Sequence, residues 1–555
     1  MSPMTNLYNR LKFYIINNKA HLRFLAIIFL IFFIPRVISL GADIGGADIQ
    51  FWYPRSHNFV HEFLRGHYQE TYQKYHPGVT VMINSGTTLT TFEFLFEKLF
   101  HFNPRYIPQQ FTRLNFAAKF PLVLIIATLL TYSSYLLSKI TNNKKYVYLF
   151  AVILSLEPFF LGISRFFHLT ALSGVFGFAS FISIYYYYFQ KKKHLYFFIL
   201  SAVFLGLGTL TKVDALIAGL INGLFFIIYE FHFTYTNQRS ILKSAWSVVK
   251  YGLFYSFLTI FTFFILFPSM WVAPLWTVQE MIHDGLEDTA FGNKGGASIT
   301  NIRAIFYPEI TFLRSSPIMT ISVIAGLFVL IKNIFIAIKK HKRLNQTQQI
   351  ILWAFIYTAL YMAILTIPSK TKDRYAAVFY PSLSIIGAWA LYCIYKINKY
   401  FKYGTLIILL LSYGFIIYRY HPVYSFYYND LIGGQKGIER HNMPVINRGE
   451  YYAQVAFYIN KNDPDAIVKN VITVHRSKIP SFQRFFYGTT YTNPKFLPDG
   501  ANADYMIFHP NDLYMLLKDN CTFIKAFGPR YPMGYDMLYL YKCEGINNTY
   551  KKMKN

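Results

Sequence analysis

Charged side chains are scarce in this chain. Only 14% of its 555 residues are Asp, Glu, Lys or Arg, whereas 54% are hydrophobic and 20% are aromatic. A soluble domain of this size needs more charge to cover its surface, so the composition excludes a soluble globular protein. Acids are scarcer than bases, 26 against 54, which gives a formal net charge of +28. A soluble nucleic-acid binder has no use for so much apolar sequence, so we expect no nucleic-acid partner and interpret the excess charge as membrane topology.

Several motifs that carry chemistry are also missing. No Cys/His cluster has the spacing of a zinc site, and neither a Walker-type glycine loop nor a GxSxG elbow occurs. Of the three cysteines, Cys393 lies in an apolar run, where we expect inert packing. Cys521 and Cys543 lie near the C-terminus, and in an oxidising compartment they are able to form a disulfide, with two free thiols as the alternative.

Long apolar runs fill most of the chain up to residue 420. Each has about 17 to 25 residues, enough to cross a bilayer as a helix. They lie near residues 22–40, 117–138, 146–163, 169–189, 195–211, 214–231, 250–269, 317–338, 349–367, 376–396 and 403–420. The sequence therefore predicts a mainly α, polytopic membrane protein with about eleven transmembrane helices. Runs 195–211 and 214–231 abut, so one of them is a candidate for a broken or re-entrant helix.

Lysine and arginine gather in every second connection between these runs. They precede the first run and recur at residues 144–145, 191–193, 339–343 and 396–402. The positive-inside rule then predicts a cytoplasmic N-terminus, and about eleven spans place the C-terminus outside. The first run is too long for a removable signal peptide and lacks a small-residue cleavage site.

The predicted topology collects the unusual polar sequence on the outer face. We expect a transmembrane domain over residues 1–420 that includes a long first extracytoplasmic loop at 41–115. Residues 421–555 change to short β-rich runs at 471–474, 504–510 and 536–542, separated by Pro, Gly and Asn. This pattern predicts a small extracytoplasmic α/β domain.

The first outer loop begins with two carboxylates, Asp43 and Asp48. A carboxylate close to where the chain leaves the bilayer is able to act as a base beside a lipid-borne substrate, and capping a helix is the alternative role. We favour Asp48, because Trp52 and Arg55 follow it at helical spacing and can form one wall of a site. The later pair His76-Pro77 shapes a substrate turn or is simply a turn.

Basic residues stand where several spans meet the outer surface. A cation at this depth is costly unless it pairs with a carboxylate or an anionic ligand, although snorkelling toward lipid headgroups explains any single one. Several cations from distant parts of the chain fit a phosphate site better. The set comprises Arg165, Lys212, Arg314, Lys370, Lys372 and Arg374. An acid, these cations and access to lipid together indicate group transfer from a phospholipid-like donor.

Successive blocks of the sequence resemble one enzyme family. They are RSHNFVHEFLRGHYQETYQKYHPGVTVM, EPFFLGISRFFHLTAL, LGLGTLTK, FPSMWVAPLW, FYPEITFLRSSP, KDRYAAVFYPSL, YSFYYNDLIGG and INRGEYYAQVAFYIN. Their order over residues 41–460 resembles bacterial membrane glycosyltransferases of the C-type (GT-C) superfamily. This group includes protein O-mannosyltransferases and the aminoarabinose transferase that acts on lipid A.

The resemblance implies a sugar donor linked to polyprenyl phosphate and an acceptor hydroxyl of a protein, lipid or cell-surface glycan, outside a bacterial plasma membrane. It maps the catalytic base onto Asp48 and phosphate contacts onto Arg165, Lys212, Lys372 and Arg374, with His76 at the family's HP position. A cofactor is not firmly expected, and a divalent metal is possible but not required because the donor is already phosphorylated.

The chain also departs from the family pattern. Ile49 stands where an acid commonly follows the base, Thr170 replaces an acid after the SR block, and the late block reads NRGEY at 447–451. These departures leave open an altered acceptor or a degraded enzyme. With one strong base candidate and no second nucleophilic carboxylate, we expect a single inverting displacement. A transporter or flippase of an anionic lipid and a non-catalytic scaffold are the competing hypotheses, although no convincing internal repeat supports the transporter.

Overall fold

The structure, a computed structural model, describes residues 19–46, 50–190, 193–236, 240–291, 296, 298–300, 302–368, 370–446, 448–473, 479–510, 520–532 and 534–547. Within these ranges, nine helical segments are long and apolar enough to cross a membrane. They are formed by α2 (Lys19–Val37), α6 (Pro108–Thr141), α9 (Leu169–Phe189), α11 (Leu216–Thr236), α12 (Ile241–Leu266), α16 (Pro317–Lys339), α17 (Gln346–Thr366), α18 (Tyr380–Tyr395) and α19 (Lys399–Tyr420). The predicted fold class is confirmed: the chain is a mainly helical, integral membrane protein.

The other two predicted spans take different forms. Run 195–211 is the single apolar helix α10 (Leu195–Thr211), which has 17 residues. Run 146–163 is split into α7 (Lys144–Leu156) and α8 (Pro158–Ile163), because Glu157 has the extended backbone that the residue before a proline prefers. The break thus lies at Glu157-Pro158, whereas α10 is continuous and is separated from α11 by an extended Lys212 and a 3-10 turn, η5 (Val213–Ala215).

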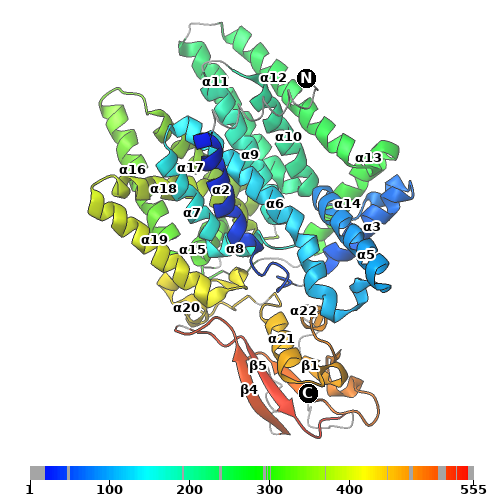
Figure 1. The fold of residues 1–555 in the computed structure, drawn as a ribbon. Coiled ribbons are helices and arrows are strands. Elements are labelled where there is room, and N and C mark those ends of the chain that lie inside the picture. The colour runs from blue at the N-terminus through cyan, green and yellow to red at the C-terminus, as the bar shows by residue number, and fades with distance from the viewer. Residues whose placement is uncertain are drawn as a thin grey trace, which may run out of the picture.

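Helix α9 forms the centre of the bundle. In its apolar window 94% of the residues are buried inside the protein, against 11% for α12 at the periphery. Figure 1 shows α9 beside α6 and α10, with α16 and α19 along the left edge of the bundle. Small residues allow this close packing, since a side chain at Gly174 would meet Val378 at 2.8 Å. Helix α9 is therefore the core helix against which the neighbouring spans pack.

Residues 41–115, predicted to form the first outer loop, are mostly helical where the structure describes them. They contain α3 (Trp52–Leu64), the 3-10 turn η2 (Tyr68–Thr71), α4 (Val79–Val81), the π-turn η3 (Met82–Gly86) and α5 (Thr87–Phe100). The 3-10 turn η4 (Pro104–Tyr106) then leads into α6. A bidentate pair ties this loop together, with Arg105 donating to Glu93 at 3.0 and 2.7 Å. Three further helices lie outside the spans: α13 (Ser269–Val272), α14 (Pro274–Phe291) and α15 (Phe306–Arg314).

The C-terminal part contains the predicted small α/β domain. Its helices are α20 (Gly434–Arg440), α21 (Tyr452–Asn462) and α22 (Ile479–Gln483). Its five strands, in sheet order β2-β1-β3-β5-β4, are β2 (Thr489–Tyr491), β1 (Asn470–Thr473), β3 (Tyr505–Phe508), β5 (Leu538–Cys543) and β4 (Cys521–Phe527). The sequence patterns indicated β1, β3 and β5 but missed β2 and β4. Cys521 and Cys543 are joined in a disulfide between β4 and β5, so the disulfide holds and the alternative of two free thiols does not.

The sheet domain lies against one end of the helix bundle (Figure 1). Figure 1 shows it beyond the point where α2 ends, with α21 and α22 facing the bundle. Phe485 packs on Phe111 of α6 with ring centroids 5.0 Å apart, and the Arg484 guanidinium lies 5.1 Å from the Tyr53 ring of α3. The domain therefore contacts the first outer loop, where the candidate acids lie.

Candidate functional site

Arg165 anchors the end of α2. Its guanidinium is 1% exposed and donates to four consecutive or nearly consecutive carbonyls: those of Pro35, Arg36 and Ile38 at 3.2, 3.2 and 2.6 Å, and that of Ser39 at 3.0 Å. Backbone carbonyls at the end of a helix have no partner within the helix and carry partial negative charge. Arg165 therefore caps α2 and fixes the direction in which the chain leaves it.

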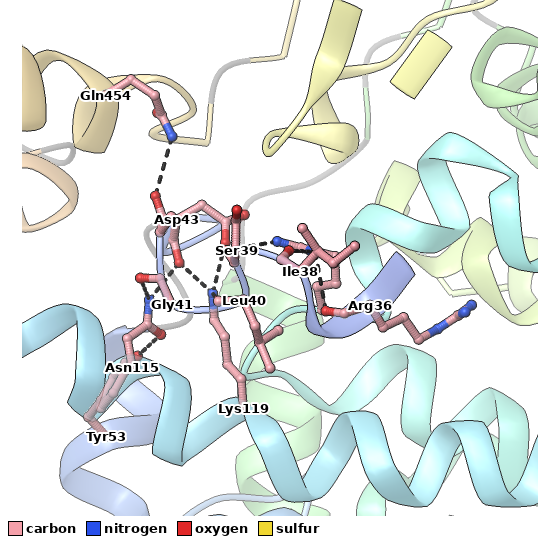
Figure 2. Close-up of polar contacts among 12 residues, drawn as sticks. Arg36, Ile38, Ser39, Leu40, Gly41, Asp43, Tyr53, Asn115, Lys119 and Gln454 are labelled. Atoms are coloured by element: carbon pink, nitrogen blue, oxygen red, sulfur yellow. Dashed lines mark hydrogen bonds and ion pairs between the residues drawn. The ribbon is translucent and has the colours of Figure 1, made fainter. Parts of the chain in front are cut away.

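Two side chains from α6 hold the segment that follows, as Figure 2 shows. Asn115 donates to the carbonyls of Gly41 and Asp43 at 2.8 and 2.7 Å, and the Tyr53 hydroxyl donates to the Asn115 amide oxygen at 2.5 Å. The fully buried Lys119 ammonium bonds the Asp43 carbonyl and lies 3.1 Å from its carboxylate. Asp43 is therefore buried, and its contacts with Asn115 and Lys119 help to hold the loop in place.

Asp48, the predicted base, lies outside the described residues. Just before it, Gly45 and Gly46 both have positive φ and pack closely on other segments of the chain. A side chain at Gly45 would lie 2.3 Å from the Phe166 ring, and one at Gly46 would lie 3.2 Å from Arg448. The acid-bearing loop thus runs between the Arg165 segment and the C-terminal block 448–451.

The turn Tyr75-His76-Pro77-Gly78 docks beside the end of α10. The Gly78 amide donates to the Thr211 carbonyl at 3.2 Å, and the hydroxyls of Thr80 and Thr211 are 2.6 Å apart. Gly78 has a φ of +64° and would place a side chain 2.3 Å from the Trp52 ring, so only glycine fits. The turn therefore carries His76 to Lys212, the residue that follows α10.

A cluster of cations surrounds His76. Lys212 is buried, forms an ion pair with Asp214, and has its ammonium 3.6 Å from the Tyr375 ring centroid. Lys370 and Arg374, from the strip before and within the 3-10 helix η7 (Asp373–Phe379), act on the same histidine together with His168. The pKa of His76 is held well below its usual value. Burial of the ring is the largest cause, and these four positive or protonatable groups add to it. His76 is therefore a neutral imidazole within a basic cluster.

The low pKa of His76 predicts a pH dependence of stability. A lowered folded-state pKa gives stability that is fully present above the unfolded-state pKa of about 6.5 and is lost as the pH falls below it. We expect the temperature midpoint of unfolding of the detergent-solubilised protein to decrease as the pH is lowered from 7.5 to 5. The decrease should be smaller in the His76→Gln variant. Scanning calorimetry across this range measures both. Equal falls in the two proteins would assign the acid sensitivity to other groups, such as His57 or His421.

Trp52 and Arg55 lie together beside His168, the residue that precedes α9. The Trp52 ring meets the His168 ring edge-on with centroids 6.3 Å apart, and the Arg55 guanidinium lies 5.0 Å from the Trp52 ring. Asp288 of α14 also reaches this region. Its carboxylate forms an ion pair with Lys370 and accepts a hydrogen bond from the Tyr75 hydroxyl at 2.6 Å. The cation cluster therefore lies between α3, the ends of α9 and α10, and α14.

Arg314 belongs to a buried ionic network rather than to this cluster. Its guanidinium donates to Asp373 at 2.6 Å and to the Tyr427 carbonyl at 2.9 Å. Arg448 bonds the same Asp373 carboxylate and lies 3.3 Å from Glu450. Burial opposes the charge of Arg448, but Asp373 and Glu450 raise its pKa above the usual value. This network joins α15, η7 and the 448–451 block, and it places Lys372 and Arg374 on either side of Asp373.

Comparison with known proteins gives a likeness to solved structures. No protein-family model matches the chain, and no curated protein matches it. The chain is similar to crystal structures of ArnT from Cupriavidus metallidurans. For the structure bound to undecaprenyl phosphate the identity is 11% and the TM-score 0.44, over 94% of this chain and 98% of that chain. For the apo structure the identity is 11% and the TM-score 0.45, over 95% and 98%.

Sequence reasoning missed several polar residues of the site. Lys119, Asp214, Asp373, Arg448 and Glu450 are all buried or nearly so and are paired as described above. Two of them had a visible signal. Asp373 stands between Lys372 and Arg374, where an acid amid bases indicates an ion pair, and Arg448 with Glu450 forms the NRGEY block. Lys119 stands alone in an apolar run, which is unusual for a residue without a partner.

Two groups of side chains in the described ranges have the spacing of metal ligands. They are Glu62 with His67 and Glu70, and Glu280 with His283 and Asp284. Glu62 already accepts from the Nδ1 atoms of His61 and His67 at 2.9 Å each, and Asp284 accepts from the Tyr72 hydroxyl at 2.9 Å. The oxygens of Glu62 and Asp284 therefore already have protein partners.

Proposed function

We propose that this protein is a membrane glycosyltransferase that moves a sugar from a polyprenyl-phosphate-linked donor to an acceptor hydroxyl on the extracytoplasmic face. One observation carries this proposal. The acid-bearing loop 41–46, the His76 turn, the end of α10 and the start of η7 come from distant parts of the chain, yet contacts through Trp52, Phe166 and Arg448 join them into one site. A base, a cation cluster and lipid access are what such a transfer requires.

The cations divide into two roles in this proposal. Lys212, Lys370 and Arg374, which act on His76, bind the donor phosphate, and Asp214 pairs with Lys212. Lys372, from the same strip as Arg374, is a further candidate phosphate contact. Arg165 and Arg314 instead hold the scaffold, because their guanidinium groups already bind backbone carbonyls or Asp373. His76, being neutral, contributes a hydrogen bond to the sugar or phosphate rather than a charge.

The prenyl chain of the donor has an apolar groove beside this cluster. The groove lies between α15, α16, α17 and α18 and has a volume of about 560 Å³. Pro308 and Ala304 line its outer end, and Leu327 and Ile386 line its inner end, deeper along the spans. Helix α15, which lines the groove, packs against η7, with the ring centroids of Tyr307 and Phe379 5.7 Å apart. A donor lying there keeps its tail among membrane helices and its phosphate at the helix ends.

The proposed chemical step is a single displacement. The acceptor oxygen attacks the anomeric carbon, and the new C–O bond forms as the bond from that carbon to the phosphate oxygen breaks. The bonding electron pair leaves on the polyprenyl phosphate, and the acceptor proton passes to the Asp48 carboxylate. Preorganised cations stabilise the negative charge that gathers on the leaving phosphate. One displacement inverts the configuration at the anomeric carbon.

The Lys212→Met variant tests this assignment. We expect the transfer rate to fall by about 10²–10³-fold, because Met keeps the length of the side chain but removes a charge that stabilises the leaving group. The rate is measured with a radiolabelled polyprenyl-phosphate sugar and wild-type membranes as the source of acceptor. Lys461→Met, which removes a charge from α21 of the outer domain, is the matched control and should keep the wild-type rate. Intact labelled donor that crosses the membrane unchanged in the wild type would favour the transporter hypothesis instead.

A further inference from the structure

Nine cations gather at the end of the helix bundle that is remote from the sheet domain. They come from the start of α7, from the end of α16 with the turn after it, and from the connection between α18 and α19. The set, called here the basic collar, comprises Lys144, Lys145, Lys339, Lys340, Lys342, Arg343, Lys396, Lys399 and Lys402. Eight of these side chains are exposed, and that of Lys402 is half-buried.

The collar is one surface, because its three parts meet at the same end of the bundle. Helices α16 and α18 are separated by one crossing, α17, so both end on the same side, where α19 begins. The start of α7 joins them, since the Tyr146 hydroxyl donates to the Ile385 carbonyl of α18 at 2.7 Å and its ring lies 6.2 Å from that of Tyr392. Helix α19 then leads away from the collar to the sheet domain, which follows it in the chain (Figure 1).

The collar lies at the depth of lipid headgroups. Near the end of α16 the apolar side chains of Phe335 and Ile338 are exposed by 67% and 69%, and the cations of residues 339–343 follow directly. On α19 the order is reversed, because Lys402 comes first and Leu410, which is 74% exposed, follows further along the helix. Exposed apolar side chains on a spanning helix face hydrocarbon, so the cations that border them lie where the phosphate groups of lipids are.

Tyrosine rings stand among these cations, whereas acids do not. The ammonium groups of Lys396 and Lys399 lie 5.4 and 5.2 Å from the ring centroids of Tyr392 and Tyr400. Tyrosine is enriched where membrane and water meet. No Asp or Glu occurs in the segments that carry the collar, which are residues 139–148, 332–349 and 392–404. These segments therefore supply no counter-ion, and their like charges repel one another unless an anion lies among them.

We propose that the basic collar binds the phosphate groups of anionic phospholipids in the leaflet remote from the sheet domain. Ammonium and guanidinium groups both bond phosphate oxygens, and clustered cations beside a spanning helix attract anionic lipids. The bound headgroups supply the counter-ions that the collar lacks, and so they hold the ends of α7, α16 and α18 together. This binding is independent of the sugar transfer proposed above, although α16 and α18 also line the groove of about 560 Å³.

The test measures how lipids change the thermal stability of the detergent-solubilised protein. Unfolding midpoints are compared with dioleoyl phosphatidylglycerol, dioleoyl phosphatidylcholine or inorganic phosphate added at equal concentrations. The collar variant carries Lys339→Gln, Lys340→Gln, Lys342→Gln and Arg343→Gln. A matched control removes the same charge from exposed positions outside the collar, by Arg65→Gln, Lys98→Gln, Lys461→Gln and Lys495→Gln.

We expect phosphatidylglycerol to raise the midpoints of the wild type and the control more than phosphatidylcholine does. The collar variant should lose roughly half of this difference, because four of its nine cations are gone. High salt should reduce the difference in the wild type, since it screens exposed charges. Equal rises with the two lipids, an undiminished difference in the collar variant, or the same rise with inorganic phosphate alone overturns the lipid site. If the collar variant does not fold, Lys339→Gln with Lys340→Gln is compared in the same way, and an undiminished difference there has the same meaning.

Discussion

Replacing Asp48 by asparagine is expected to lower sugar transfer by about 10²–10⁴-fold, the usual contribution of a positioned general base. Asparagine has nearly the same shape but cannot accept the acceptor's proton. The variant should therefore still be stabilised by a polyprenyl phosphate, because the cation cluster is unchanged. Transfer of a radiolabelled sugar from the donor, together with a thermal-shift assay, measures the two properties separately.

The same substitution at Asp43 is the matched control, and it should fail differently. Asp43 is 6% exposed and pairs with Lys119, which is fully buried. Removing this carboxylate leaves a buried ammonium without its counter-ion, which destabilises the fold. We expect Asp43→Asn to lower the thermal midpoint and Asp48→Asn to leave it unchanged. Wild-type transfer in Asp48→Asn would remove Asp48 from the mechanism, and an inactive but fully stable Asp43→Asn protein would make Asp43 the base.

Replacing Asp373 by asparagine is expected to destabilise the folded protein by about 3–5 kcal/mol, the usual cost of removing one partner from a buried ion pair. The carboxylate is 6% exposed and serves two guanidinium groups, those of Arg314 and Arg448. Without it both positive charges remain buried close together. The strip that carries Lys372 and Arg374 and the 448–451 block then lose their common anchor.

Equilibrium unfolding in detergent, followed by tryptophan fluorescence, measures this loss of stability. Glu287→Gln is the control, because the pair between Glu287 and His283 is 59% and 67% exposed, and exposed pairs contribute little. We expect no measurable change in that variant. A loss of stability for Asp373→Asn no greater than for Glu287→Gln would mean that the two arginines find other partners, and the network would not be the anchor described here.

Much of the membrane domain could be predicted from the pattern of apolar runs. The run 169–189 coincides with α9, and 195–211 with α10, because a bilayer requires a continuous apolar helix of nearly fixed length. The break at Glu157-Pro158 was missed, since hydropathy averaged over a window hides one polar residue before a proline. Strands β2 and β4 were also missed, because short strands carry a weak pattern and β4 is largely exposed along its length.

The candidate site was predictable by residue type but not by role. The sequence does not distinguish the roles of Arg165, Arg314 and Lys212, because each is a cation at the end of a predicted span. Their partners decide what each one does: Arg165 binds the carbonyls that end α2, Arg314 shares Asp373 with Arg448, and Lys212 pairs with Asp214 beside His76. These partners are brought together only when helices that are distant in the chain pack side by side.

By itself the sequence determined that this protein lives in a membrane, where its spans run and which segments are rich in acids and bases, because composition and periodicity act locally. Only the tertiary structure decided which cations are already neutralised, that His76 is neutral among four basic groups, and that one apolar groove borders residues 37–42 while a separate one lies between α15 and α18. Charge pairing and cavities depend on distances between remote residues, and those distances are set by how the helices pack.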